Sequence, residues 1–305
     1  MSRYVSSRIL QAIPALIGVT VIVFLVLQLS GDPASILLPL DASDADRAAF
    51  RRAYGLDQPI PVQYVNYMSQ LVRGDFGRSF AYQEPALQVV MRRLPATLEL
   101  AVLSSLLANL IAIPAGVFAA LHRGKLFDRG LMGIVLLGQS IPTFWLGMML
   151  ALLVAVQFGM LPVSGRGSWQ HVILPTVTLA FWLVALLARV TRSEMLEVLN
   201  RDYVRTARAK GLPERKIITA HELRNALPPI VTVMGLQFGG LLGGAVMTET
   251  VFAWPGVGTL ILESISKRDY PVVMTGILVV AGLFILINLS MDLLYGYIDP
   301  RIKTA

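Results

Sequence analysis

The stretch DYVRTARAKGLPERKIITAHELRNALP, residues 202–228, is a highly charged segment between two long apolar runs. Gly211 stands where a short helix would end in a left-handed residue, and Pro213 suits the first turn of the next helix. Val204, Ala207 and Gly211 share one side of the first helix, and basic side chains project from its other sides. We therefore expect two short helices that meet at a sharp corner, with a small apolar face that a partner can approach closely.

This segment resembles the cytoplasmic "EAA" loop of the membrane permease subunits of ABC importers, which has the form EAA, three residues, Gly. Here the same register reads RTA, RAK and then Gly211. The initial Glu-Ala is replaced by Arg-Thr, as is usual in the dipeptide and oligopeptide branch of that family. The resemblance implies an ATPase-coupling site at Tyr203, Arg205, Thr206, Ala207, Arg208, Ala209, Lys210, Gly211 and Leu212.

The composition is that of a membrane protein. The chain is 55% hydrophobic and only 15% charged, which is rare for a soluble domain of 305 residues. Its net charge of +7 comes from basic residues in short loops between apolar runs, so it indicates membrane topology and no nucleic-acid partner. The chain has no cysteine, which excludes a disulfide framework and a thiolate metal site.

Six apolar runs are long enough to cross about 30 Å of hydrocarbon as helices. The first is too long for an ordinary signal peptide and has no clear cleavage site after it, so we expect a retained anchor. The basic residues of the short loops place both termini in the cytoplasm, and the resemblance implies the bacterial cytoplasmic (inner) membrane. The predicted spans are residues 9–29, 98–121, 131–158, 172–190, 229–250 and 272–295.

The domain organisation follows from these spans. We expect an anchor helix at residues 1–29, an extracytoplasmic cap at 30–97, and a permease core at 98–305 that contains the coupling loop 191–228. In the cap, Ser43 or Asp44 is predicted to begin a helix that runs through residue 53, and residues 63–72 and 86–94 have a similar helical pattern. The cap is interpreted either as a turn-rich solvated surface or as the region that receives a substrate-binding protein.

Small residues on the fifth span predict close helix packing in lipid, with direct substrate contact as the alternative. They are Gly235, Gly239, Gly240, Gly243 and Gly244. After this span comes FAWPGVG, residues 252–258, in which Trp254 suits a lipid-headgroup anchor. The string also resembles the external loop of peptide-importer permeases, which implies that it packs against the translocation path.

Prolines and polar residues at membrane depth are the candidates for a translocation path or gate. Pro114 and Pro142 each remove a backbone donor inside a predicted span, so we expect kinks there. Asp292 is an ionisable group near the inner end of the last span, and a structural pairing with Arg189 or Arg192 is preferred over substrate contact. The candidate path residues are Asn109, Gln139, Ser140, Pro142, Gln237 and Asp292.

Catalytic and metal motifs are missing from the sequence. There is no GxxxxGKS/T phosphate loop, and HELRN at residues 221–225 lacks the second histidine of the HExxH zinc motif. No GxSxG nucleophile elbow occurs either. We therefore expect no enzyme activity, no catalytic residue, no metal site and no cofactor on this chain, with ATP and Mg held by separate ATPase subunits.

The resemblance extends over essentially the full length, through the coupling loop, the Trp254-Pro255-Gly256 turn and the Asp299-Pro300-Arg301 end. It implies an all-α polytopic membrane protein with six transmembrane helices of the type I ABC importer permease fold and an extracytoplasmic helical cap after the first. The implied partners are a second homologous permease subunit, two cytoplasmic ATPase subunits, an extracytoplasmic substrate-binding protein and the lipid bilayer. The implied mechanism is ATP-driven alternating access.

The cargo is less determined than the class. All three histidines lie in loops or at span ends and Asp292 is alone, so we predict peptides or a peptide-like solute such as glutathione. A nickel or other small-solute importer permease is the alternative. An ion-coupled secondary transporter would need a coupling-ion site on repeated halves, and a membrane enzyme would need a convergent catalytic set. Neither feature is found in the sequence.

Overall fold

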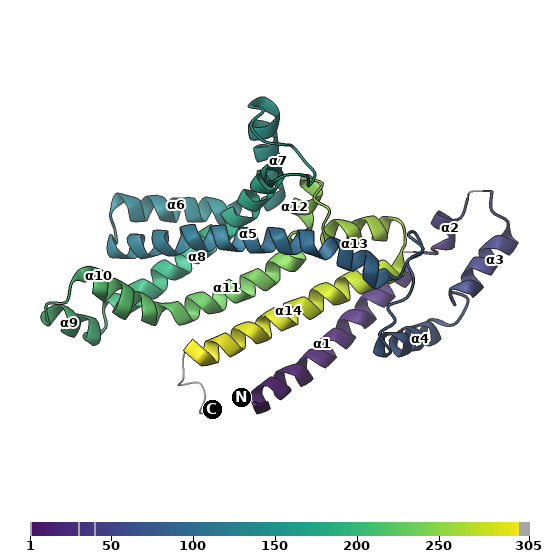
Figure 1. Ribbon diagram of the computed structural model, residues 1–305, viewed down its shortest axis with the longest axis horizontal. Coiled ribbons are helices and arrows are strands. Elements are labelled where there is room, and N and C mark those ends of the chain that lie inside the picture. The colour runs from purple at the N-terminus through teal and green to yellow at the C-terminus, as the bar shows by residue number, and fades with distance from the viewer. Residues whose placement is uncertain (1, 30, 40, 299–305) are drawn as a thin grey trace. The chain divides into compact units, whose positions relative to one another are not determined.

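A computed structural model describes residues 2–29, 31–39 and 41–298, and this part of the chain is built from helices (Figure 1). Within it, the extended pairing is a single isolated bridge between Arg78 and Pro85. The chain divides into two compact units. The N-terminal unit comprises Met1–Thr97 and Pro255–Leu283, and the central unit comprises Leu98–Trp254 and Phe284–Ala305.

The N-terminal unit contains the helix that follows the N-terminus and the short helices of the cap. Ser43 accepts the backbone N–H of Asp46 and so begins the third helix at Asp44, as predicted. The predicted helix 86–94 does not stop before the second span but continues through Pro95 into it. The helices are α1 (Ser2–Leu29), α2 (Ala34–Leu37), α3 (Asp44–Ala53), α4 (Ile60–Val72), the start of α5 (Ala86–Leu121), α13 (Val257–Ser266) and the first part of α14 (Tyr270–Ile298).

A buried carboxylate holds the N-terminal unit together. Asp269 is fully buried just before α14 and accepts the backbone N–H groups of Phe80 and Ala81 at 3.0 and 3.1 Å. The Ser79 hydroxyl donates to the same carboxylate. These charge-assisted bonds tie the loop before α5 to the start of α14.

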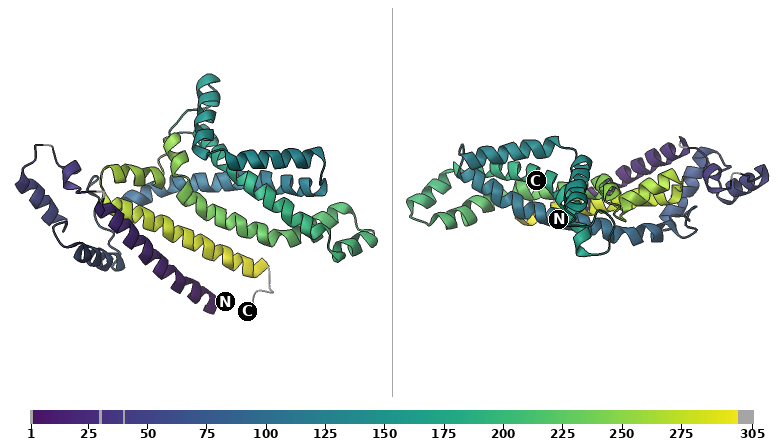
Figure 2. Two further views of the ribbon diagram at one scale, coloured as in Figure 1. Left: turned by 180° about the vertical axis from the view of Figure 1, so that it is seen from behind. Right: turned by 90° about the horizontal axis from the view of Figure 1, so that it is seen from above.

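The central unit is a helix bundle in which α8 packs against both α6 and α11 (Figure 2). The α8 helix is buried along much of its length, from Leu174 to Val198. The elements are α6 (Leu126–Ser140), α7 (Thr143–Leu150), the π-helical η1 (Ala151–Gln157), α8 (Trp169–Leu199), α9 (Asp202–Ala209), α10 (Glu214–Lys216), the π-helical η2 (Ile217–Leu223), α11 (Arg224–Gly244) and α12 (Val246–Val251).

Four helical stretches in the described residues are long and apolar enough to cross a membrane, and a fifth span is possible if one bent pair counts as one. The four are Ala86–Leu121, Trp169–Leu199, Glu214–Gly243 and Tyr270–Met291. The bent pair, Leu126–Ser140 with Thr143–Gln157, covers the predicted span 131–158. The Ile13–Leu29 part of α1 is a shorter apolar helix.

The break at Pro142 is sharper than the predicted kink. The two helices of the bent pair meet at 101°. Ile141, the residue before the proline, is extended with φ −83° and ψ 122°. The proline ring disfavours a helical conformation for the residue that precedes it, so α6 ends at Ser140 instead of bending through.

The corner after α9 is confirmed, but only one of the two predicted short helices is separate. Gly211 has φ +73°, the left-handed conformation expected of it, and Pro213 is the N-cap of α10. From Glu214 the helix continues through η2 into α11, because no glycine or proline follows until Pro228. The corner therefore joins one short helix to the base of a predicted span.

Candidate coupling site

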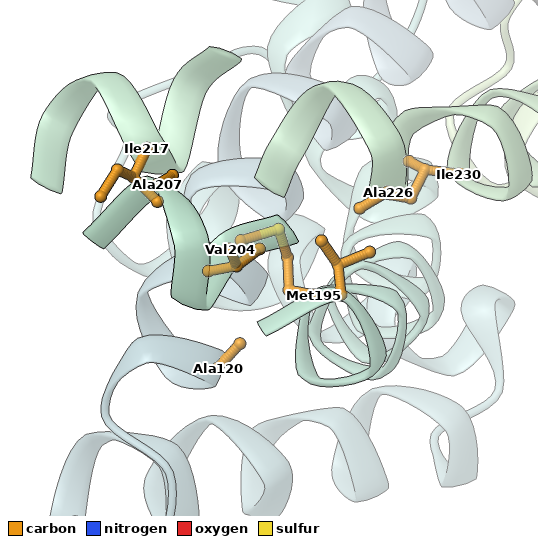
Figure 3. Packing of buried hydrophobic residues seen from close by; sticks show 8 residues of the cluster. Ala120, Met195, Val204, Ala207, Ile217, Ala226 and Ile230 are labelled. Atoms are coloured by element: carbon orange, nitrogen blue, oxygen red, sulfur yellow. The ribbon is translucent and has the colours of Figure 1, made fainter. Parts of the chain in front are cut away.

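The apolar face of α9 is buried inside the central unit. Val204 and Ala207 are 0% and 6% exposed, and they lie in one apolar cluster with Met195 of α8 and Ile217 of η2 (Figure 3). This corrects the expectation that a partner approaches that face. An eight-residue helix cannot hold its place alone, so its apolar side packs on the neighbouring helices instead.

The polar side of α9 remains available to a partner. Tyr203 is 42% exposed, and burial of the rest of the side chain raises the pKa of its hydroxyl. Arg205 lies 3.7 Å from Asp202 across an exposed pair that contributes little stability. The other exposed members of the predicted set are Thr206, Ala209, Lys210 and Gly211, and Leu212 is half-buried.

Arg208 links α9 to the helix that follows the corner. Its Nε donates to Glu214 Oε1 at 2.8 Å, and its Nη2 donates to Glu222 Oε1 at 3.0 Å. The hydrogen bond to Glu214 raises the pKa of the Arg208 guanidinium. Glu222 is fully buried, and its Oε2 has no hydrogen-bond partner among the described residues. Arg208 therefore connects α9 to α10 and η2 through ion pairs and is not only a surface cation.

Glu222 is a functional candidate that sequence reasoning missed. It was considered only as part of a failed zinc motif, HELRN. Glu222 lies in the predicted loop, seven residues before the predicted span 229–250, so the sequence alone gives no sign that its carboxylate is buried and needs a cation. Only the fold shows that Arg208 supplies it.

The end of α9 depends on the backbone of Gly211. The Gly211 N–H donates to Arg208 O at 2.9 Å, and the Leu212 N–H donates to Ala207 O at 3.3 Å. These bonds close the helix end in the manner that a left-handed residue permits. A Cβ built on Gly211 meets nothing within 4 Å. This position therefore requires glycine for its left-handed backbone conformation and not for lack of space.

Arg192, one of the two partners expected for Asp292, pairs with Asp128. Its Nη2 donates to Asp128 Oδ2 at 2.8 Å, and its Nε donates to Oδ1. The other, Arg189, donates to Gln139 Oε1 at 3.0 Å. Asp128 lies in the first turn of α6, and Arg192 reaches it from α8. The Asp292 side chain lies outside the described residues.

The candidate path residues come from several helices of the central unit. Asn109 lies on α5, Gln139 and Ser140 end α6, and Gln237 lies on α11. Asn109 Oδ1, Gln139 Nε2 and Gln237 Nε2 are buried without a hydrogen-bond partner in the part of the chain that the structure describes. The Ser140 hydroxyl donates to Leu136 O at 2.8 Å. Unsatisfied buried amides are rare in proteins and need water or a further group.

The glycines of α11 fall into two sets. A Cβ on Gly235 would lie 2.4 Å from Met291 Cγ, and one on Gly239 would lie 2.8 Å from Phe284 Cδ2, so these two lie against α14. Gly240 and Gly243 have nothing within 4 Å of such a Cβ. The surroundings of Gly244 lie outside the described residues.

Trp254 is buried inside the central unit and is not presented to lipid headgroups. It is 1% exposed, and the Arg166 guanidinium lies 5.6 Å from the centre of its ring. Arg166 also donates to Glu99 at 2.7 and 2.9 Å, so it ties the Trp254 turn to α5. The turn is a packed part of the bundle, in contrast to an interfacial anchor.

Long apolar helices joined by a short charged helix with a buried apolar base are the arrangement that the sequence predicted for an integral-membrane transport permease. Solved structures agree on the fold. Inward-facing forms of the MetNI methionine ABC transporter match with TM-scores of 0.58 and 0.60 at 21% and 23% identity. Each match covers 71% of this chain and 99% of the other. The type I ABC importer permease fold is therefore confirmed.

The chain belongs to the family of binding-protein-dependent transport system inner membrane components, which it matches over residues 112–304. The N-terminal part of such components matches residues 1–101. This confirms the resemblance that the coupling loop suggested, and it makes the chain a multi-pass permease of a binding-protein-dependent importer.

Relatives match the chain from end to end. The di/tripeptide transport system permease protein of Pseudomonas aeruginosa is 43% identical over 333 residues, with 99% of each chain covered. The dipeptide transport system permease protein of Escherichia coli K12 is 42% identical over 336 residues, again with 99% of each covered. The glutathione transport system permease protein of Salmonella choleraesuis is 44% identical over 304 residues, with the same coverage.

Proposed function

We propose that this chain forms one half of the membrane path of an ATP-driven importer that carries peptides or peptide-like solutes into the cytoplasm by alternating access. The observation that carries the proposal is α9. It is a short charged helix whose apolar base is embedded in the bundle and whose polar side is exposed. Such a helix is suited to receive a displacement from a partner and to pass it to the bundle.

The connection between α9 and the bundle supports this role. The cluster around Val204 and Ala207 includes Ala120 at the end of α5, Met195 of α8 and Ile230 of α11 (Figure 3). Close-packed interiors deform little, so a push on α9 moves the ends of these three helices together. ATP-driven closure of a pair of ATPase subunits would supply the push, and hydrolysis would release it.

The family supports the partners that such a cycle requires. A binding-protein-dependent component implies a substrate-binding protein. The proposed assembly adds a second homologous permease subunit and two cytoplasmic ATPase subunits that hold ATP and Mg. The proposed coupling surface is the exposed side of α9, from Tyr203 to Gly211. Both termini are proposed to lie in the cytoplasm, with the cap of residues 30–97 outside.

Peptide cargo is supported by the relatives, whose names specify di/tripeptide, dipeptide and glutathione transport. The described residues hold no group of three or more side chains that would bind a metal ion. The amides of Asn109, Gln139 and Gln237 are proposed to line the path, where their unpartnered atoms would contact water or the peptide backbone. Nickel remains the alternative cargo.

Uptake by liposomes that contain the full set of partners tests the cargo and the energy source. Di- and tripeptides or glutathione should enter saturably, and uptake should stop when ATP is depleted at a constant ion gradient. Saturable ATP-dependent nickel uptake with no response to any peptide would overturn the peptide assignment. Uptake that follows the ion gradient and not ATP would overturn the importer class.

Single cysteines in the naturally cysteine-free chain test the orientation and the coupling surface. Cysteine at Ser43 should react with an impermeant thiol reagent from outside, whereas cysteine at Ala209 should not. The exposed Ala209 position should instead crosslink to an ATPase subunit, and cysteine at the exposed Ala220 on η2 is the matched control. The reverse labelling pattern would overturn the topology, and equal crosslinking at both positions would overturn the assignment of α9.

A further inference from the structure

The cap helix α4 has an unusual composition for a helix in water. No charged residue occurs between Asp57 and Arg73, a stretch that contains the whole of α4. The neighbouring cap helix α3 has the sequence DADRAAFRRA and is charged at half of its positions. A helix on a solvated surface normally carries charged side chains on its outer side, so α4 needs another explanation.

One side of α4 packs along α1. Tyr64 Oη lies 2.9 Å from Thr20 Oγ1, and its ring lies 5.3 Å from that of Phe24. Further along, Gln28 Nε2 donates to Gln63 Oε1 at 2.8 Å. Thr20, Phe24 and Gln28 follow at intervals of four residues, so these contacts of α4 fall on one face of α1, toward its C-terminal end. Figure 1 shows α4 beside that end of α1.

The contacts on α1 fall within its apolar run. No charged residue occurs from residue 9 to Leu29, and Ile22 and Val26 are 64% and 56% exposed, as expected of a helix that lies in lipid. Thr20 precedes Leu29 by nine residues, which is about 13 Å along a helix. The hydrocarbon is about 30 Å thick, so α4 contacts α1 inside the half of the membrane at the Leu29 end.

The two remaining sides of α4 differ in chemistry. Gln63, Asn66 and Gln70 line a cavity of about 370 Å³ within the N-terminal unit. Val62, Val65 and Val72 lie on a separate side and are 44%, 64% and 83% exposed. None of the three valines lines the cavity. The helix therefore has a packed side, an amide side toward the cavity and an open aliphatic side.

We propose that α4 is embedded in the membrane beside α1, in the leaflet at the Leu29 end, with Val62, Val65 and Val72 among the acyl chains. In the topology proposed above this is the outer leaflet. The Tyr64 hydroxyl then pairs with Thr20 within the hydrocarbon layer, where a polar group needs a partner, and the amide side faces the cavity of the N-terminal unit. Part of the predicted extracytoplasmic cap is thus a membrane element.

Lipid fits the open side better than a protein partner does. The valine side has no charged group and no hydrogen-bonding group other than Ser69. A soluble binding protein that docks and leaves would meet a polar rim, since transient interfaces are about as polar as the rest of a protein surface. The exposed aliphatic residues of α1 lie at the same depth and require the same apolar surroundings.

Spin labels on single cysteines test the proposal in the complete transporter in liposomes. Cysteine replaces Val65 or Val72, with Asn66→Cys as the matched control one residue away and Ser43→Cys as the reference in water. Each labelled variant is first shown to retain uptake. Labels at Val65 and Val72 should collide more often with oxygen, which concentrates in lipid, and less often with a water-soluble nickel chelate. The ratio should reverse at Asn66.

Two results would overturn the proposal. Chelate collisions at Val65 and Val72 equal to those at Ser43 would place the valines in water. Protection of both labels from oxygen and chelate alike would show that a protein, either the second permease subunit or the binding protein, covers them. Neither result would bear on the importer class, which the uptake assay tests separately.

Discussion

Replacement of Gly211 by valine tests the proposed mechanical role of the corner after α9. The residue has φ +73°, and an added Cβ meets no atom within 4 Å, so the penalty is purely conformational. A β-branched residue held in this region costs about 1–3 kcal/mol. The penalty is small against the stability of a bundle and large for a helix of eight residues, so the end of α9 should move while the bundle stays folded.

A penalty of this size should lower coupled transport by about 5- to 150-fold. The assay is peptide uptake by liposomes with all partners present, together with co-purification of the ATPase subunits and a test that the variant inserts in the membrane. Gly211→Asn is the matched control, because asparagine enters the left-handed region at low cost, and it should retain most of the uptake.

Normal uptake and normal ATPase co-purification in Gly211→Val would refute the reasoning. That result would fit a solvated basic loop that meets anionic lipid, for which loss of one glycine changes little. Equal loss in the valine and asparagine variants would also refute it, because the left-handed backbone would then not be the cause.

Three further predictions concern other contacts. Arg208→Ala leaves the carboxylate of Glu222 buried without its cation and should destabilise the protein by about 1–3 kcal/mol in thermal unfolding, and Glu222→Gln in the same chain should restore part of the loss. Gly235→Ala should destabilise the bundle by about 1–3 kcal/mol, because the new Cβ would lie 2.4 Å from a side chain of α14. Gly243→Ala, whose Cβ meets nothing within 4 Å, should be neutral or stabilising. Equal unfolding temperatures of the two variants would contradict this prediction. Hydrogen bonds at the start of α3 hold the pKa of Asp46 below its ordinary value, so their stabilisation is complete above about pH 4 and is lost as the pH falls further. The protection of the α3 amides from hydrogen exchange, relative to their intrinsic exchange rate at each pH, should therefore fall in acid, and Asp46→Asn should remove that dependence.

Much of the candidate site could be predicted because its signals are local. Gly211 and Pro213 impose backbone conformations that do not depend on distant residues, and the corner between them is as expected. Ser43 begins α3 for the same reason. The burial of Val204 and Ala207 was harder to predict, because a small apolar face on a short helix can pack either against a partner or against other helices of the same chain.

Ion pairing was the least predictable feature. The sequence offers several carboxylates that could pair with Arg192. The one that the fold places beside it, Asp128, lies 64 residues away in the sequence. The brace from Arg208 to Glu222 depends on a turn that brings two helices side by side. A single sequence does not specify such pairs, because they are chosen by packing and not by spacing.

The sequence by itself determined the membrane class, most of the helical spans, the short charged helix that follows Arg201 and the corner at Gly211. These follow from composition, apolar run length and local backbone preference, which act over a few residues. Tertiary structure alone decided that α9 turns its apolar side inward, that the helices on either side of Pro142 meet at 101°, that Trp254 is buried and that α4 packs along α1. Those outcomes depend on which surfaces meet, and burial and charge pairing are properties of the assembled fold.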